Sequence, residues 1–105
     1  MQLLHLLGLA AAVTAIDIRF FEGGNCDGNW KVHTNTNPNT CYRQGDGVRY
    51  QSIGFFGVPF DWRVEARGYN DGNCGTETVV ERASNTNFIC LRTSNNFASA
   101  GYGFW

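Results

Sequence analysis

Apolar and polar residues alternate one by one in several short stretches of the chain. In the clearest stretch, residues 16–20, Asp17 and Arg19 separate three apolar side chains. Three further stretches show the same alternation: residues 30–34, 40–43 and 53–58. A period of two is typical of a strand with one buried face. The segments between these stretches are rich in Gly, Asn and Asp, which favour turns. The pattern therefore predicts short strands joined by turns.

The alternating pattern occurs twice. Residues 16–21 (IDIRFF) align with residues 64–69 (VEARGY), and in both an acidic and then a basic residue stand between apolar ones. The same offset of 48 residues aligns Cys26 with Cys74. With one inserted residue, two further pairs align: Cys41 with Cys90, and residues 54–56 with residues 103–105. Repetition at this period indicates a duplicated supersecondary unit.

This duplication predicts an all-β fold. Four short strands in each copy make about eight, and eight strands with turn-rich connections are typical of a two-sheet β-sandwich. We expect a single domain over residues 16–105. It consists of motif 1 (16–56), a connector (57–63) and motif 2 (64–105), and the two motifs share one core.

Four cysteines predict a disulfide framework. An even number of cysteines in a small chain bound for an oxidising compartment favours disulfides over zinc, and the chain contains no C-x-x-C pair. If each copy closes its own loop, the pairs are Cys26–Cys41 and Cys74–Cys90. The other two connectivities that four cysteines allow stay open.

Residues 1–15 resemble a signal peptide. A leucine-rich run is followed by alanines and by Val13-Thr14-Ala15, whose small residues suit cleavage after Ala15. A membrane anchor is the alternative, but the apolar run is shorter than the ~20 residues that a spanning helix needs. We therefore expect a secreted, extracellular protein. Its net charge of −1 and scattered basic residues disfavour nucleic acid and anionic membranes as partners.

The repeat also resembles the Greek-key motif of the βγ-crystallins. That motif opens with an aromatic residue, a second aromatic five residues later and a glycine two beyond. Phe21, Cys26 and Gly28 occupy these steps in motif 1, with cysteine in place of the second aromatic. Tyr69 and Cys74 do so in motif 2, which has Thr76 where the glycine is expected. The whole of residues 16–105 fits two such motifs and is similar to small secreted cysteine-containing proteins of filamentous fungi.

This resemblance implies a function in binding. Similar secreted proteins act as killer toxins or antifungal proteins, as effectors, or as metalloprotease inhibitors, although a fold does not fix a function. We expect a monomeric effector or antifungal, killer-toxin-like protein that engages a host or competitor protein or a cell-wall glycan. The alternatives are an extracellular protease or hydrolase inhibitor acting through residues 57–63, and a structural, calcium-stabilised protein.

The resemblance also implies a weak calcium site. βγ-crystallins often bind Ca²⁺ through two Asn or Asp residues, two other residues and then two Ser or Thr residues. Residues 95–100 fit this pattern through Asn95, Asn96 and Ser99, while Ala100 departs from it. Ca²⁺ prefers six to eight oxygen ligands including carboxylates, which these residues lack, so a plain turn is the alternative.

No catalytic site is predicted. His33 lies in an alternating stretch, on the face opposite to Trp30, where we expect it to be exposed. Four carboxylates, Glu22, Asp27, Asp71 and Glu77, lie in predicted turns, where solvated loops explain them as well as glycoside hydrolysis does. Recognition is expected instead at Phe60, Asp61 and Trp62 in the connector, because two aromatic residues there flank an acid in a Pro-containing segment.

Overall fold

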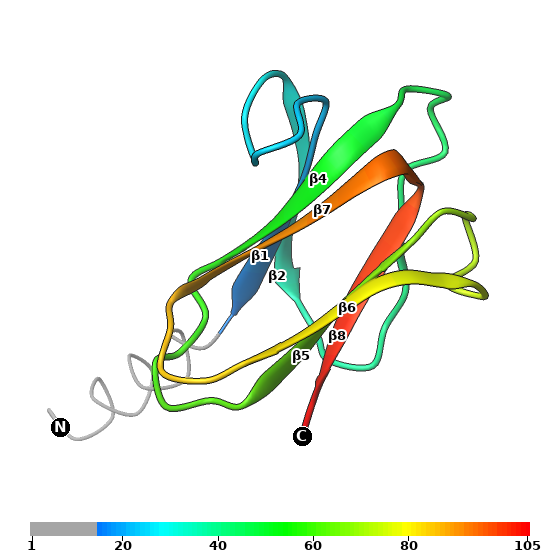
Figure 1. Cartoon of the computed structure of the whole chain (residues 1–105). Coiled ribbons are helices and arrows are strands. Elements are labelled where there is room, and N and C mark those ends of the chain that lie inside the picture. Colours follow the sequence, from blue (N-terminus) through cyan, green and yellow to red (C-terminus); the bar gives the residue numbers. More distant parts are fainter. Residues whose placement is uncertain (1–14) are drawn as a thin grey trace, which may run out of the picture.

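Eight strands form two four-stranded antiparallel sheets that face each other across one core (Figure 1). The computed structural model describes residues 15–105, so the predicted signal peptide, apart from Ala15, lies outside the described residues. Among residues 15–105, no helix has the length and apolarity needed to cross a membrane. The strands are β1 (Ile16–Phe21), β2 (Trp30–Thr36), β3 (Tyr42–Arg43), β4 (Tyr50–Phe56), β5 (Val64–Tyr69), β6 (Glu77–Ala83), β7 (Phe88–Phe97) and β8 (Ser99–Phe104).

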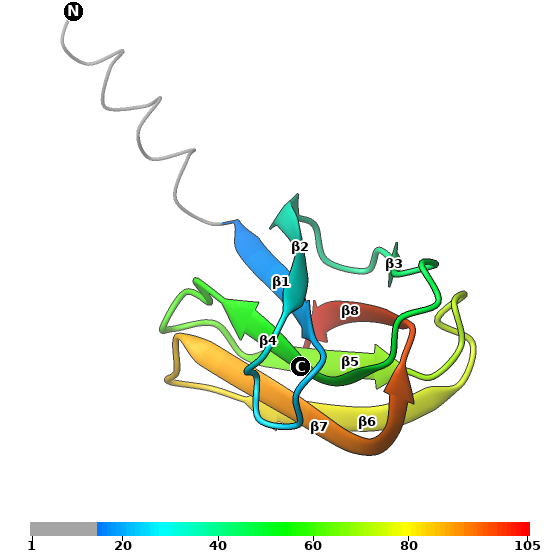
Figure 2. The same cartoon turned by 90° about the horizontal axis from the view of Figure 1, so that it is seen from above.

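The two motifs exchange their third strands. The first sheet has the order β2-β1-β4-β7 and the second has the order β3-β8-β5-β6. Strand β3 of motif 1 therefore pairs with β8 of motif 2, and β7 of motif 2 pairs with β4 of motif 1. Figure 2 shows β3 beside β8, separated from the other strands of its own motif. The predicted all-β sandwich of two Greek-key motifs is confirmed.

The predicted disulfide pairing is wrong. The bonds join Cys26 to Cys90 and Cys41 to Cys74, so both run between the motifs. Strand exchange is the reason. Cys26 lies in the β1–β2 turn of the first sheet, and β7 brings Cys90 to that sheet, whereas Cys41 leaves it with β3 to join the second.

The first strands of the two motifs correspond residue by residue in burial. β1 and β5 show the same sequence of buried and half-buried residues, with Arg19 and Arg67 at the same step. Arg19 lies opposite Gly54 on β4, and Arg67 lies opposite Gly101 on β8. Gly54 therefore corresponds to Gly101, and the correspondence of residues 54–56 with 103–105 drawn from sequence is wrong by two residues.

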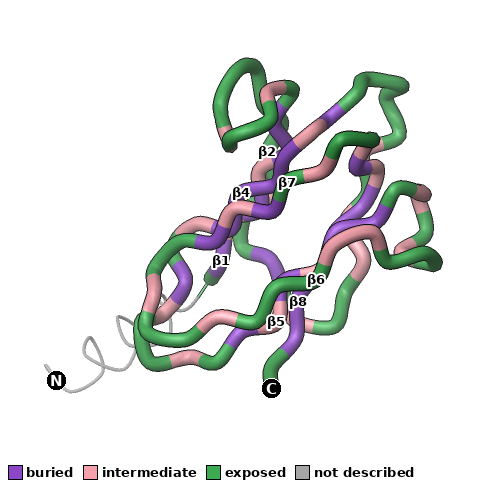
Figure 3. The backbone as a smooth tube through the Cα atoms, viewed as in Figure 1, coloured by how far each residue is buried: buried purple, intermediate pink, exposed green. Residues whose placement is uncertain are grey.

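The core lies between the facing sides of the sheets, where Figure 3 shows the buried segments, while the turns at both ends are exposed. Burying each large apolar side chain contributes roughly 1.5–3 kcal/mol. Both motifs supply large, fully buried side chains to this core, among them Phe20, Tyr50, Ile53, Phe55, Leu91, Phe97 and Tyr102. One shared core follows, as predicted.

Two buried serines hold the first turn of each motif. The Ser52 hydroxyl on β4 accepts a hydrogen bond from the Cys26 amide at 2.8 Å and donates one to the Gly23 carbonyl at 2.5 Å. The Ser99 hydroxyl on β8 makes the equivalent pair with the Cys74 amide and the Asp71 carbonyl. Both cysteines have a left-handed backbone, with φ of 54° and 53°, which non-glycine residues rarely adopt. The serines and the disulfides together keep these turns folded over the sheets.

Candidate functional site

The outer faces of the two sheets carry the same arginine in different surroundings. Arg19 on β1 and Arg67 on β5 occupy corresponding positions, each opposite a glycine and near a disulfide. Their neighbours differ, so the duplication offers a direct comparison.

On the first sheet, Arg19 lies between two aromatic rings. Its guanidinium carbon is 4.5 Å from the ring centroid of Trp30 and 4.3 Å from that of Phe56. The Phe56 ring contacts that of Phe88, with centroids 4.9 Å apart. Trp30, Arg19, Phe56 and Phe88 come from β2, β1, β4 and β7 in that order, so they cross the whole sheet. We call these four residues the aromatic row.

The aromatic row is exposed at both ends. Trp30 is 47% exposed and Phe88 is 45% exposed, although aromatic side chains of this size contribute most when buried. Val32, which pairs with Arg19 from β2, is also exposed. An exposed apolar surface built from four strands is typical of an interaction site.

Within residues 15–105, Arg19 has no carboxylate at ion-pair distance, and its buried Nε has no hydrogen-bond acceptor. Asp17 stands where motif 2 has Glu65, but its side chain is one methylene shorter. Its carboxylate instead accepts a hydrogen bond from the Asn35 amide at 3.3 Å. The first face therefore combines exposed rings with a cation that has no protein counter-ion among the described residues.

On the second sheet, Arg67 is neutralised. Its Nε donates to Glu65 at 2.7 Å, and Glu77 lies 4.0 Å away. Arg82 donates to the other Glu65 oxygen at 2.9 Å. Hydrogen bonds from Arg67 and then from Arg82 lower the pKa of Glu65, so this carboxylate stays ionised and keeps its partners. Around Arg67, therefore, the second face carries ion pairs where the first carries aromatic rings around Arg19.

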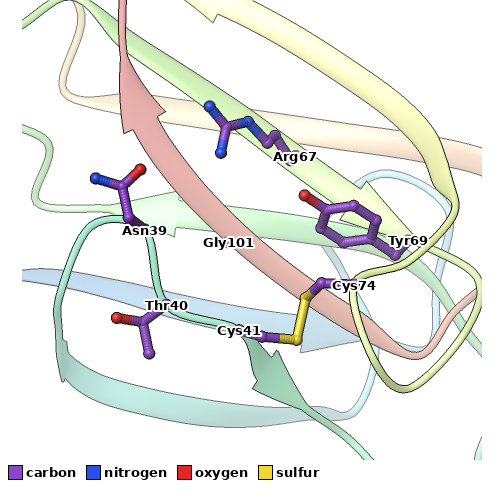
Figure 4. A pocket seen from close by; sticks show the side chains of 7 residues that line it. All are labelled: Asn39, Thr40, Cys41, Arg67, Tyr69, Cys74 and Gly101. Carbon is purple, nitrogen blue, oxygen red and sulfur yellow. A yellow bond between two sulfur atoms is a disulfide. The ribbon is translucent and has the colours of Figure 1, made fainter.

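A cavity of about 260 Å³ opens on the second face beside Arg67 (Figure 4). Its lining includes Tyr69 on β5, Asn39 before β3 and the Cys41–Cys74 disulfide. Burial raises the pKa of Tyr69, so its hydroxyl stays protonated. The cavity therefore offers neutral hydrogen-bonding groups next to a paired arginine. We call it the second-sheet pocket.

The connector residues predicted to bind are only partly exposed. Phe60 is 57% exposed, more than the other large apolar residues that the structure describes, and Asp61 is exposed beside it. Trp62 instead is half-buried and packs edge-on against Phe104, with ring centroids 5.1 Å apart. Phe60 and Asp61 thus form the tip, and Trp62 fastens the connector to the sandwich.

The residues predicted to bind calcium make contacts within the protein. Both hydrogen-bonding functions of the Ser99 hydroxyl are used in the second turn, and this residue is buried. The Asn96 side-chain oxygen accepts a hydrogen bond from the Tyr50 amide at 2.9 Å. The Asn95 carbonyl accepts one from the Arg49 guanidinium at 3.2 Å, which brings a positive charge to this turn.

A family model described as ARB_05566_N, N-terminal domain, matches residues 17–105. The chain belongs to this family. No curated protein and no solved structure matches the chain. The family match begins at the second residue of β1 and covers the other seven strands completely, so the ARB_05566_N domain contains both motifs.

In this member of the ARB_05566_N family, His33 is not the exposed strand residue predicted from sequence. It is half-buried, packs edge-on against Phe20 and contacts the ring of Tyr42. Its Nε2 lies 2.8 Å from the side-chain oxygen of Gln44. His33 pairs with Ile18, which is buried, so its side chain lies on the inner side of β2 and joins the packing under β3.

Sequence reasoning missed the residues that distinguish the two faces. Trp30, Phe56 and Phe88 are far apart in sequence, and only strand exchange brings β7 beside β4. The two-residue error in register also set Ser52 against Gly101 and hid its correspondence with Ser99. A serine two residues before a glycine, present in both β4 and β8, was the available signal.

Proposed function

We propose that this protein is a non-catalytic extracellular binding protein, and that the aromatic row is its contact surface. One observation carries the proposal: Arg19 is held between the exposed Trp30 ring and the half-buried Phe56 ring without a counter-ion among the described residues. Aromatic residues and arginine are enriched at protein interfaces, and Trp and Arg supply much of their binding energy. The natural occupant is a protein surface.

The partner that fits is a protein presenting a carboxylate between apolar side chains. Its carboxylate would accept charge-assisted hydrogen bonds from the Arg19 guanidinium, which are stronger than those between neutral groups. Its apolar side chains would cover Trp30 and Phe88, which are exposed in the free protein. A polar partner without the carboxylate would leave Arg19 desolvated and unpaired, which disfavours binding.

Two disulfides in so small a domain fit an extracellular protein. Secretion through residues 1–15 and action as a fungal effector or antifungal protein are part of the proposal. The likeness of the two Greek keys to βγ-crystallin-like secreted proteins supports them. Binding to a host or competitor protein is the activity that such a role requires.

The experiment compares three purified proteins spanning residues 16–105: the natural chain, a Trp30→Ala/Phe88→Ala double variant, and Val80→Ala. Val80 is exposed on the second sheet and pairs with Arg67 as Val32 pairs with Arg19, so it provides a matched control. Each protein is added to yeast cultures and to plant leaves, and growth and cell death are scored.

We expect the natural chain and Val80→Ala to inhibit growth or to cause cell death, and the double variant to be inactive. Proteins captured by the natural chain are then purified and their affinities measured. The double variant should bind at least tenfold more weakly, because each lost anchor costs about 1 kcal/mol or more. Equal affinity of the double variant and the natural chain would refute the proposed surface.

A second candidate function rests on the connector. Phe60 and Asp61 stand at a tip that is held on both sides, because Val58 is buried and the Trp62 amide donates to the Pro59 carbonyl at 3.0 Å. A rigid, exposed apolar side chain suits the pocket of a protease. Stoichiometric inhibition of a metalloprotease that is lost in Phe60→Ala, and kept in the double variant above, would favour an inhibitor.

A further inference from the structure

We propose that the second-sheet pocket binds one neutral sugar residue. The pocket lies on the face opposite to the aromatic row, and its residues take no part in the function proposed above. Figure 4 shows Arg67, Tyr69 and Asn39 arranged around the β8 backbone at Gly101, with the Cys41–Cys74 disulfide at one side. The inference rests on how these positions differ from their counterparts in the first sheet.

Two aromatic side chains of the first face have no counterpart on the second, where Arg67 and Asn39 occupy the corresponding space beside the pocket. On the first sheet, Phe56 lies opposite Asp17. At the corresponding position of the second sheet, Gly103 lies opposite Glu65. Asn39 stands two residues before Cys41, as Phe88 stands two before Cys90. A side chain at Gly103 would enter occupied space, because its Cβ would lie 2.9 Å from Arg67 Nη2 and 3.0 Å from the Asn39 side-chain oxygen.

A third difference between the two faces adds a hydrogen-bonding group to the second-sheet pocket. Tyr69 replaces Phe21 at the end of the first strand and differs from it by a hydroxyl alone. Asn39 provides a donor and an acceptor on one carboxamide, and the Arg67 guanidinium has donors beyond the Nε that Glu65 engages. A ring with several hydroxyls can satisfy donors and acceptors that lie this close together.

Charge favours a neutral ligand over an anion. Glu65 pairs with Arg67 and Glu77 lies close to it, so a carboxylate or phosphate would meet negative charge as well as the cation. The cavity is slightly smaller than the ~300–1,000 Å³ typical of ligand pockets, which suits a single ring. Together these observations point to one hydroxylated, uncharged ring.

The test is a titration of isotope-labelled protein followed by two-dimensional NMR. The neutral probes are the methyl glycosides of glucose, mannose, galactose and N-acetylglucosamine, and the charged probes are glucuronate and inorganic phosphate. We expect at least one neutral glycoside to shift the amide signals of Tyr69 and Gly101 saturably, and the charged probes to leave them in place. An oligosaccharide ending in the same sugar then shows whether a glycan terminus or only the free sugar is accepted.

Two variants each remove one hydrogen-bonding group of the pocket and are chosen to suit the local fold. Tyr69→Phe places in motif 2 the residue that motif 1 has at Phe21. Asn39→Gly removes the carboxamide and suits the left-handed backbone, whose φ is 56°. Each should lower the affinity roughly fivefold, the effect of one hydrogen bond. Trp30→Ala, on the other face, should change nothing.

Three results would overturn the inference. The first is that no glycoside produces a saturable shift at the pocket. The second is that glucuronate or phosphate binds there in place of the glycosides. The third is that both pocket variants bind the glycoside with the same affinity as the natural chain. None of these bears on the aromatic row, whose own test uses Trp30 and Phe88, so the two proposals succeed or fail separately. Thermal unfolding of each variant confirms that it is folded before the titration.

Discussion

Replacing Ser52 by alanine tests whether one hydroxyl holds the first turn of motif 1. The side chain is fully buried, and its loss removes two hydrogen bonds, to the Cys26 amide and the Gly23 carbonyl. A hydrogen bond contributes about 1 kcal/mol net, and a buried group left without a partner costs roughly 1–3 kcal/mol. The turn is partly exposed, so water can reach one of the two freed groups. We expect the free energy of unfolding to fall by about 2–4 kcal/mol.

This loss is large for a domain of this size, whose whole stability is typically ~5–15 kcal/mol. The assay is urea unfolding with the disulfides intact. At a slope of ~2 kcal/mol per molar, the midpoint should fall by roughly 1–2 M. Ser99→Ala, at the corresponding position of motif 2, should show the same loss, while Ser94→Ala, at an exposed site on β7, should stay within about 0.5 kcal/mol of the natural chain. A Ser52→Ala midpoint equal to that of Ser94→Ala would refute the reasoning.

Four further predictions concern the disulfides, the aromatic row and two titrating side chains. Digestion without reduction should release a peptide that joins Cys26 to Cys90, and a peptide joining Cys26 to any other cysteine would contradict the strand exchange. Gly54→Ala should lower the free energy of unfolding by about 1–3 kcal/mol in the same urea assay, because the new Cβ would lie 2.5 Å from the Phe56 ring. An unchanged midpoint would contradict this prediction and would mean that the Phe56 ring moves aside without cost. A hydrogen bond from the Tyr50 hydroxyl lowers the pKa of the Asp46 carboxyl. The ionised carboxylate therefore stabilises the fold above its ordinary pKa, and this stabilisation is lost as the pH falls and the carboxylate is protonated. The melting temperature of Asp46→Asn should therefore depend less on pH in the acid range than that of the natural chain. Burial raises the pKa of Tyr50 to about 12, so stability should fall between pH 10 and 12. Tyr50→Phe should show a smaller fall, because burial also raises the pKa of Tyr69 and Tyr102, which the variant keeps.

The fold class could be predicted from sequence because it depends on local periodicity. Alternation at residues 16–20 and its repetition at 64–69 specify two half-buried strands, and β1 and β5 show that same burial. Turn-rich segments supply the strand ends for the same local reason. None of this depends on which strand lies next to which.

Pairing between strands could not be predicted in the same way. A two-residue strand such as β3 has no pattern that tells whether it joins its own motif or the other, because an alternating face suits either sheet. The disulfide prediction assumed that each motif keeps its own strands, and it failed on that assumption. The calcium residues were taken from a local motif, and the structural role of Ser99 depends on a turn 25 residues earlier.

The candidate site shows the same division. Phe60 and Asp61 were identified because they are neighbours in the chain, and both are exposed. Their neighbour Trp62 packs against Phe104, which lies at the far end of the chain, and sequence could not indicate that contact. The aromatic row draws on four strands, so it depends on tertiary structure that the sequence pattern does not specify.

Because both disulfides join one motif to the other, they decide what happens when the backbone is cut. Any single break between Cys41 and Cys74, including one anywhere in the connector, separates the chain into two pieces that remain joined by both covalent bridges. With the pairing expected from the duplication, the same nick would leave two unlinked halves. A protein cleaved in the connector therefore stays one covalent particle, which runs as a single band on a gel until a reductant is added.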